Sequence, residues 1–154
     1  RGFLDLVVPR AELKETVGQE VGVSNWVEAT QERINQFAQA TGDNQWIHTD
    51  PERCRLESPH GVPIAHGYLT IALTPALVDE VLQINGMRMG VNYGMNKLRF
   101  TAPVPVGSRI RVRVTLKGVR EIAGAIQTVT QLSVEREGQE KPCCLAETLS
   151  LYYP

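Results

Sequence analysis

Hydrophobic and polar residues alternate strictly over residues 109–117, which is the two-residue period of a β-strand with one buried face. One face carries Ile110, Val112, Val114 and Leu116, and the other carries Arg109, Arg111, Arg113 and Lys117. A weaker alternation predicts a second strand over residues 126–134, with residues 118–124 as the connection. Residues 92–100 and 145–153 predict two more strands. The second half of the chain is therefore expected to form an antiparallel sheet.

The first half of the chain shows a helical period instead. Apolar or small residues recur at the spacing of one helix face, at Ile34, Phe37, Ala38 and Thr41. Thr30 is suited to cap the start of this helix, and Gly42 is suited to end it. Residues 43–66 contain three prolines and are expected to form a loop.

Residues 67–82 are apolar on nearly every side, which is typical of a buried helix. Pro75 is expected to bend this helix or to limit its first turns. One buried helix followed by several long strands predicts an α+β fold in which an antiparallel β-sheet curls around the helix.

Composition narrows the class of protein. The length of 154 residues suits one domain over residues 1–154, with residues 1–20 as its N-terminal extension. A formal net charge of -1 argues against a nucleic-acid-binding protein, because contacts with phosphates need a surplus of basic residues. No apolar stretch approaches the length of a membrane span, and residues 1–10 lack the apolar core of a signal peptide.

The three cysteines are Cys54, Cys143 and Cys144, an odd number with two adjacent. This pattern does not fit a disulfide framework, and no pair has the spacing of zinc ligands. We expect free thiols in a cytoplasmic protein, and no metal site.

Asp43 and His48 are the first candidates for catalysis. They are five residues apart, directly after the predicted helix end, so a tight loop could direct both side chains into one cavity. A carboxylate and an imidazole that share one water molecule form a competent acid/base unit. On spacing alone the alternative is at least as good: Asp43 caps a turn and His48 is an ordinary loop histidine.

The second candidate is the sequence Ala-His-Gly-Tyr at residues 65–68, where the buried helix is expected to begin. A helix N-terminus presents unpaired N–H groups, and Gly67 would let a ligand approach the backbone. A carbonyl oxygen that gains negative charge during a reaction would be stabilised there. The alternative is a simple tight entry into a helix. His66 either points to a ligand or forms hydrogen bonds within the loop.

Taken together, these segments resemble the MaoC-like hydratases, the (R)-specific enoyl-CoA hydratases of the hot-dog fold. The resemblance rests on residues 37–51 (FAQATGDNQWIHTDP) and 61–70 (GVPIAHGYLT), and it continues in residues 93–107 (YGMNKLRFTAPVPVG). It covers residues 20–153. The tryptophan in the first segment is most similar to the branch that contains nodulation protein N-like sequences.

The resemblance implies specific roles. Asp43 and His48 match the catalytic pair that holds the water added to C3 of a trans-2-enoyl thioester, and the Gly67 N–H matches the donor to the thioester carbonyl oxygen. Substrate-binding positions fall at Gln45, Ala65, His66 and Asn96. Two positions depart from the family: Gln45-Trp46 stands where many members have Asn-Pro, and Pro75 stands near a serine that assists some short-chain members.

The expected function is thus an enoyl-CoA hydratase, a hydro-lyase of fatty acid metabolism that needs no cofactor beyond the acyl-CoA thioester substrate. Two alternatives stay open: an acyl-CoA thioesterase of the same fold, and a non-catalytic subunit that binds acyl thioesters. We expect a homodimer, with the acyl chain in an apolar tunnel beside the buried helix. Basic residues, with the strand over residues 109–113 as a candidate, are expected to hold the CoA phosphates.

Overall fold

An antiparallel sheet dominates the fold in the computed structural model, which describes residues 6–8 and 10–154. Residues 1–5 and 9, part of the predicted N-terminal extension and of the segment tested for a signal peptide, lie outside the described residues. The sheet has the order β2-β6-β7-β8-β5, and β3 also pairs with β6. Its strands are β2 (Glu20–Val23), β3 (Val27–Glu28), β5 (Met89–Phe100), β6 (Arg109–Ile122), β7 (Ala125–Arg136) and β8 (Cys144–Tyr153). The four predicted strands are confirmed.

The predicted connection over residues 118–124 is wrong. Strand β6 continues to Ile122, and the chain turns at Ala123 and Gly124. The pairing of β6 with β7 shifts register between Leu116 and Gly118, as in a β-bulge. The bulge interrupts the alternation of apolar and polar residues, but β6 continues beyond it. The sequence pattern therefore predicted too early an end for this strand.

Helix α1 (Gln31–Thr41) has the predicted ends. The Thr30 side chain accepts a hydrogen bond from the Arg33 N–H, and the Gly42 N–H donates to the Ala38 carbonyl. Gly42 has a φ of 82°, a left-handed conformation that glycine adopts without steric cost. The cap therefore fixes the direction in which the chain enters the next segment.

The predicted loop over residues 43–66 contains two short helices, α2 (Trp46–Thr49) and α3 (Pro51–Glu57). Asp50 caps α3 by accepting a hydrogen bond from the Arg53 N–H, and Pro51 occupies the first turn. Proline is favoured at that position because its missing N–H has no partner there anyway. The sequence interpretation treated Pro51 only as a helix breaker.

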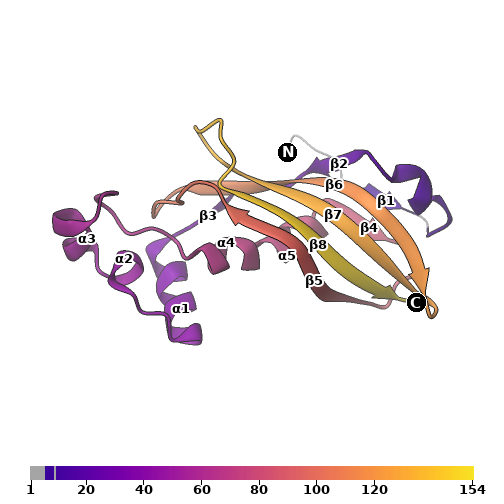
Figure 1. Cartoon of the computed structure of the whole chain (residues 1–154), viewed down its shortest axis with the longest axis horizontal. Helices are drawn as coiled ribbons and strands as arrows, with labels where there is room; N and C mark the ends of the chain where they lie inside the picture. The colour runs from indigo at the N-terminus through magenta and orange to yellow at the C-terminus, as the bar shows by residue number, and fades with distance from the viewer. Residues whose placement is uncertain (1–5, 9) are drawn as a thin grey trace.

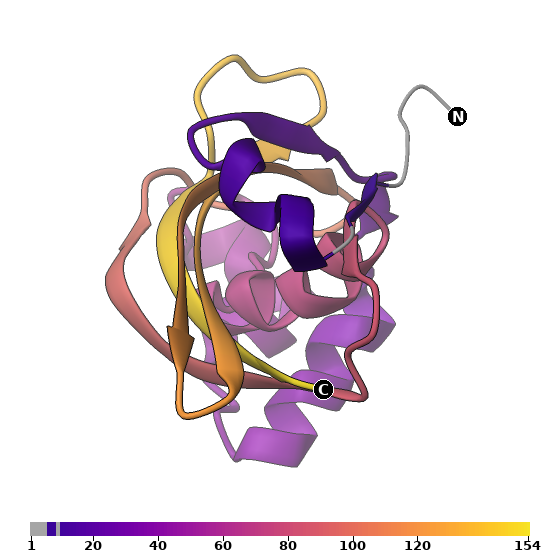
Figure 2. The ribbon, with the colours of Figure 1, turned by 90° about the vertical axis from the view of Figure 1, so that its right-hand side faces the viewer.

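Pro75 divides the predicted helix over residues 67–82 into α4 (Gly67–Ala72) and α5 (Thr74–Asp79). Proline removes one helical hydrogen bond, and the Ile71 carbonyl instead accepts one from the Thr74 hydroxyl at 2.7 Å. Figures 1 and 2 show the sheet curled around α4 and α5, as the predicted α+β fold requires.

The expectation that this helical segment is buried on all sides is wrong. Leu69, Ile71 and Leu77 belong to the core that includes Val112 and Leu132, but one side of the segment is open. The exposed residues on that side are Tyr68, Ala72, Pro75 and Ala76, with Asp79 at its end. An exposed apolar face on an otherwise buried element is typical of a surface that another chain or a ligand covers.

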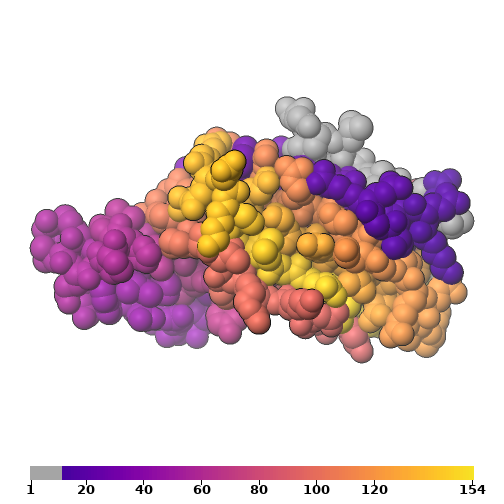
Figure 3. Space-filling model, turned by 45° about the horizontal axis from the view of Figure 1, so that its top comes forward, coloured from indigo at the N-terminus to yellow at the C-terminus, as the bar shows by residue number. Residues whose placement is uncertain are grey.

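The N-terminal region contributes elements that the sequence did not predict. Strand β1 (Leu6–Val8) runs parallel to β4 (Leu82–Ile84), and a 3-10 helix η1 (Arg10–Thr16) follows it. Helices α1 to α3 lie at the opposite end of the molecule and project beyond the sheet (Figure 3). Among the described residues, no helix has the length and apolar character needed to cross a bilayer.

Candidate active site

Asp43, His48 and His66 lie together where the projecting helices meet the start of α4. One donor atom from each side chain lies within 4.8 Å of the others. Asp43 follows Gly42, and His48 lies on α2, so the capped end of α1 and the short helix hold the first pair. The Gln31 side chain on α1 donates to the His48 carbonyl at 2.9 Å, which ties α2 to α1. The predicted proximity of Asp43 and His48 is therefore present.

His48 has a defined tautomer. Its Nδ1 lies 2.7 Å from the Ile64 carbonyl oxygen, which can only accept, so Nδ1 carries the proton and Nε2 has a free lone pair. The side chain is 7% exposed, and this burial lowers the pKa of the imidazole below its ordinary value despite the hydrogen bond to Ile64 and the charge of Asp43. His48 is thus suited to accept a proton at neutral pH.

His66 contacts both Asp43 and His48. It is 2% exposed, and its ring stacks on that of His48 with a centroid distance of 3.9 Å. Its Nε2 donates to the Asp43 carbonyl at 3.0 Å, and the Phe37 ring packs against it at a tilt, with a centroid distance of 4.9 Å. Of the two readings left open for His66, the hydrogen bond into the loop is observed and positions Asp43, while the contact with substrate stays a prediction.

The Nδ1 atom of His66 is buried and has no hydrogen-bond partner among the described residues. Because Nε2 carries the proton, Nδ1 is an acceptor. The stacked rings of His48 and His66 place their in-plane lone pairs side by side instead of directing them at one point. A zinc ion needs ligand nitrogens that converge at about 2.0–2.1 Å, so this geometry favours bound water over a metal.

The segment before α4 is held by backbone pairing with residues 104–106. The Ala65 N–H donates to the Val104 carbonyl, and the Val106 N–H donates to the Pro63 carbonyl, both at 2.8 Å. This pairing places Gly67 as the first residue of α4, where its N–H has no acceptor within the helix. Ala65 is buried and lines the same cavity as His48 and Gly67.

That cavity has a volume of about 350 Å³. Phe100 on β5 forms its opposite wall and lies so close to Gly67 that a Cβ there would be 2.7 Å from the ring. Only glycine fits at this position without displacing the aromatic ring. His48 and the start of α4 therefore open onto one space that could hold a small polar group.

Two predicted substrate-binding residues, Asn96 and Gln45, do not line the cavity of His48. Asn96 donates to the Glu147 carboxylate at 2.8 Å and lines a separate hollow with Tyr93, so the structure does not bring it to the cavity of His48. Gln45 is exposed at the start of α2, where its backbone carbonyl accepts from the His48 N–H. Its contribution is to the shape of the turn.

The arginines of β6 form ion pairs on the face of the sheet that points away from α4. Arg111 and Arg113 both contact the Glu135 carboxylate, and Arg113 also contacts Glu20. Arg109 pairs with Glu137 at 3.0 Å. With their charges matched and their strand face opposite the helices, these arginines do not support the expected contact with CoA phosphates.

The cysteines are free, as predicted, and the structure shows that all three are buried. Burial raises the pKa of both Cys143 and Cys144 to about 11, and that of Cys54 also rises. Cys143 borders the cavity of His48, but a thiol with this pKa is not an effective nucleophile at neutral pH. The acid/base pair is the reactive feature of the cavity.

Comparison with known proteins identifies a family. Residues 12–138 match the family model described as MaoC like domain. The chain is 48% identical over 143 residues to 3-hydroxyacyl-thioester dehydratase Z of Mycobacterium tuberculosis, covering 92% of this chain and 94% of that protein. It is 40% identical over 148 residues to nodulation protein N of Rhizobium meliloti, covering 92% and 89%.

Among solved structures, the (R)-hydratase from A. caviae involved in PHA biosynthesis superposes with a TM-score of 0.70. The match covers 90% of this chain and 96% of that one at 23% identity, which shows a shared hot-dog fold. The predicted resemblance, including the likeness to nodulation protein N, is confirmed.

Proposed function

The chain belongs to the MaoC-like domain family, and on that premise we propose that it adds water to a trans-2-enoyl-CoA to give the (R)-3-hydroxyacyl-CoA. Two observations support the proposal: the Asp43 carboxylate lies within 4.8 Å of a ring nitrogen of His48, whose Nε2 is free, and His48 and Gly67, at the start of α4, line one cavity. The name of the relative that is 48% identical, a 3-hydroxyacyl-thioester dehydratase, describes the same reaction in reverse.

In the proposed reaction, Asp43 and His48 hold one water molecule. His48 Nε2 takes a proton from the water as its oxygen bonds to C3 of the enoyl group, while Asp43 accepts the second hydrogen bond and orients the water. Electrons shift from the double bond to the thioester carbonyl oxygen, which the Gly67 N–H stabilises. The proton on His48 then passes to C2, so the pair returns to its starting state without a cofactor.

The test is a hydration assay with crotonyl-CoA and longer trans-2-enoyl-CoAs, followed by the loss of the enoyl-thioester absorbance and by chiral analysis of the product. The proposal expects the (R) product. An (S) product or the absence of hydration would overturn it. Release of free CoA from saturated acyl-CoA would indicate a thioesterase instead, and tight acyl-CoA binding without turnover would indicate a binding subunit.

The pH dependence of hydration follows from the lowered pKa of His48. The neutral imidazole accepts the proton, so kcat/KM is expected to stay constant above pH ~6.5, the ordinary value, and to fall only as the pH drops through the lower pKa of the folded enzyme. A pH–rate profile with crotonyl-CoA measures this. An acidic limb centred above the ordinary histidine value would contradict the role given to His48.

The proposed assembly is a homodimer that pairs along β5. This strand is at the edge of the sheet and exposes Met89, Val91, Tyr93 and Met95 at 40–59% of their surface. An unpaired apolar edge strand is a liability that pairing with a second copy removes. The exposed side of α4 and α5, at Ala72, Pro75 and Ala76, would be covered by the same contact.

Tyr93→Asp on β5 is expected to weaken this dimer by roughly 30-fold or more, because truncating a buried interface tyrosine costs about 2 kcal/mol. Light scattering on a dilution series measures the shift. Leu56→Asp is the matched control, since Leu56 is 67% exposed on α3, away from β5. A mass unchanged at every dilution in Tyr93→Asp would show that β5 is not the interface.

A further inference from the structure

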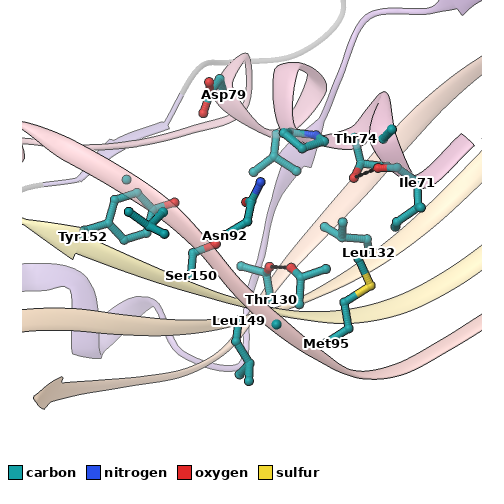
Figure 4. Close-up of a pocket in the computed structure, with 17 residues that line it drawn as sticks. Ile71, Thr74, Asp79, Asn92, Met95, Thr130, Leu132, Leu149, Ser150 and Tyr152 are labelled. Carbon is teal, nitrogen blue, oxygen red and sulfur yellow. Dashed lines mark hydrogen bonds between the residues drawn. The ribbon is translucent and has the colours of Figure 1, made fainter. Parts of the chain in front are cut away.

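A second cavity of about 410 Å³ lies between α4–α5 and the inner face of the sheet. It begins four residues after Gly67, at Ile71, and it ends at Asp79, the last residue of α5 (Figure 4). The strands follow the same direction, because Phe100 pairs with Cys144 beside the catalytic cavity and Gly90 pairs with Tyr152 at the far end. The second cavity therefore lies beyond the proposed site in the direction of the helices, although the two cavities share no lining residue.

The two ends of this cavity differ in chemistry. Ile71, Leu132 and Met95 line the end nearer to Gly67. The far end is polar: Asn92, Ser150 and Tyr152 lie near one another in Figure 4, and Asp79 stands apart from them at the end of α5. An acyl chain that enters from the catalytic cavity would meet apolar carbon first and hydrogen-bonding groups last.

The polar groups nearer the middle are already satisfied. The Thr130 and Thr148 hydroxyls bond to each other at 2.6 Å, and Thr74 donates to the Ile71 carbonyl. At the far end, Tyr152 has a side-chain hydrogen bond with Ser150, but no hydrogen bond between described residues uses the Asn92 amide. An amide offers both donors and an acceptor, so Asn92 can bind a hydroxyl group of a ligand.

The negative charge of Asp79 also affects which ligand groups can bind at the far end of the second cavity. Asp79 lies beside Tyr152, whose pKa is raised by burial and by the Asp79 carboxylate. Asp79 forms no ion pair with a described residue. A ligand carboxylate placed here would face this negative charge, whereas a hydroxyl could donate to it. Asp79 and Asn92 are exposed in the single chain, so a methyl group would leave them without water or partner only once the proposed contact along β5 covers this end.

We propose that this enzyme prefers enoyl thioesters whose acyl chain carries a hydroxyl group at its far end, and that Asp79 excludes the corresponding carboxylates. The inference rests on the proposed function, since it assumes that the thioester is bound at Gly67. Asn92 and Ser150 recognise the hydroxyl, and the apolar end near Ile71 holds the methylene groups between.

Three matched series test the preference: trans-2-enoyl-CoAs of increasing length that end in a methyl, a hydroxyl or a carboxylate group, from hexenoyl to decenoyl. At the length that reaches Asn92, the hydroxyl-terminated substrate is expected to exceed its methyl parent in kcat/KM by roughly tenfold, and the carboxylate to fall below both. A methyl preference at every length would overturn the inference.

Two variants test whether Asn92 and Asp79 cause the substrate preference. Asn92→Leu is expected to reduce the hydroxyl-to-methyl ratio to about one, and Asp79→Asn to raise the rate with the carboxylate series by roughly tenfold. Each rate is divided by the same variant's rate with crotonyl-CoA. Asn85→Leu is the matched control, because Asn85 is exposed in a turn outside the cavity. Ratios that do not change in Asn92→Leu would overturn the assignment.

Binding separates this inference from the proposed reaction. The affinities of 8-hydroxyoctanoyl-CoA and octanoyl-CoA, which cannot be hydrated, are measured by titration calorimetry. Tighter binding of the hydroxy compound without hydration of crotonyl-CoA would support the inference and overturn the proposed reaction. Equal binding together with crotonyl-CoA hydration would do the reverse.

Discussion

The His48→Ala variant is expected to lose about 10²–10⁴-fold in kcat/KM for hydration, the usual contribution of a positioned acid/base group. The loss arises because Nε2 of His48 is the free lone pair in the cavity, its Nδ1 being committed to the Ile64 carbonyl. Asp43→Asn is expected to lose a similar factor, since the amide presents a donor where the water needs an acceptor. Steady-state kinetics with crotonyl-CoA measure both.

The matched control for His48→Ala is His60→Ala, because His60 is exposed in the turn after α3. His60→Ala is expected to keep the wild-type rate. Circular dichroism and thermal unfolding establish that the two catalytic variants remain folded. If folded His48→Ala and Asp43→Asn both hydrate crotonyl-CoA at the wild-type rate, the proposed reaction at this site is excluded.

Gly67→Ala is expected to lower kcat by about 10²-fold, near the effect of removing one oxyanion donor. The N–H remains in the variant, but its new Cβ would be 2.7 Å from the Phe100 ring, so either the ring or the start of α4 must move. A displaced N–H no longer faces the thioester oxygen in the transition state. The measurement is the kcat for crotonyl-CoA, with KM determined separately.

Two variants distinguish the clash between the new Cβ at position 67 and the Phe100 ring from the effect of replacing any glycine by alanine. In Gly118→Ala on β6, the new Cβ meets only Val129 at 3.7 Å, an ordinary contact, so activity is expected to persist. Adding Phe100→Leu to Gly67→Ala removes the ring edge and is expected to restore part of the lost rate. Full activity in Gly67→Ala alone would show that the Phe100 ring moves and the start of α4 does not, which would contradict the expected loss.

Sequence patterns predicted the elements with long, regular signals. Strand β6 alternates over nine residues, and α1 has both a Thr30 cap and a Gly42 end, so both were found. The two-residue strand β3 has no measurable period, and it forms because β6 offers it a partner. Helix α3 was missed because its Pro51 was interpreted as a breaker.

In the candidate site too, residues close in sequence could be predicted, and contacts between distant segments could not. Asp43 and His48 are close in sequence, so spacing and resemblance found them together. The role of His66 depends on a hydrogen bond to a carbonyl 23 residues away, which no local pattern contains. Asn96 was assigned by resemblance alone, and within one chain its side chain bonds Glu147 and does not line the cavity of His48, so its contact with substrate stays a prediction.

The two histidines link the two segments of the site, residues 43–48 and residues 64–66, by reciprocal hydrogen bonds. His48, from the first segment, bonds the backbone of Ile64 in the second, and His66, from the second, bonds the backbone of Asp43 in the first. Between them, α3 contacts α2 through the buried Cys54 thiol, but the exposed turn at residues 58–62 makes none of these bonds. Insertions in that turn should leave the reacting groups in place, which makes it a natural point for the chain to acquire new recognition without rebuilding its chemistry.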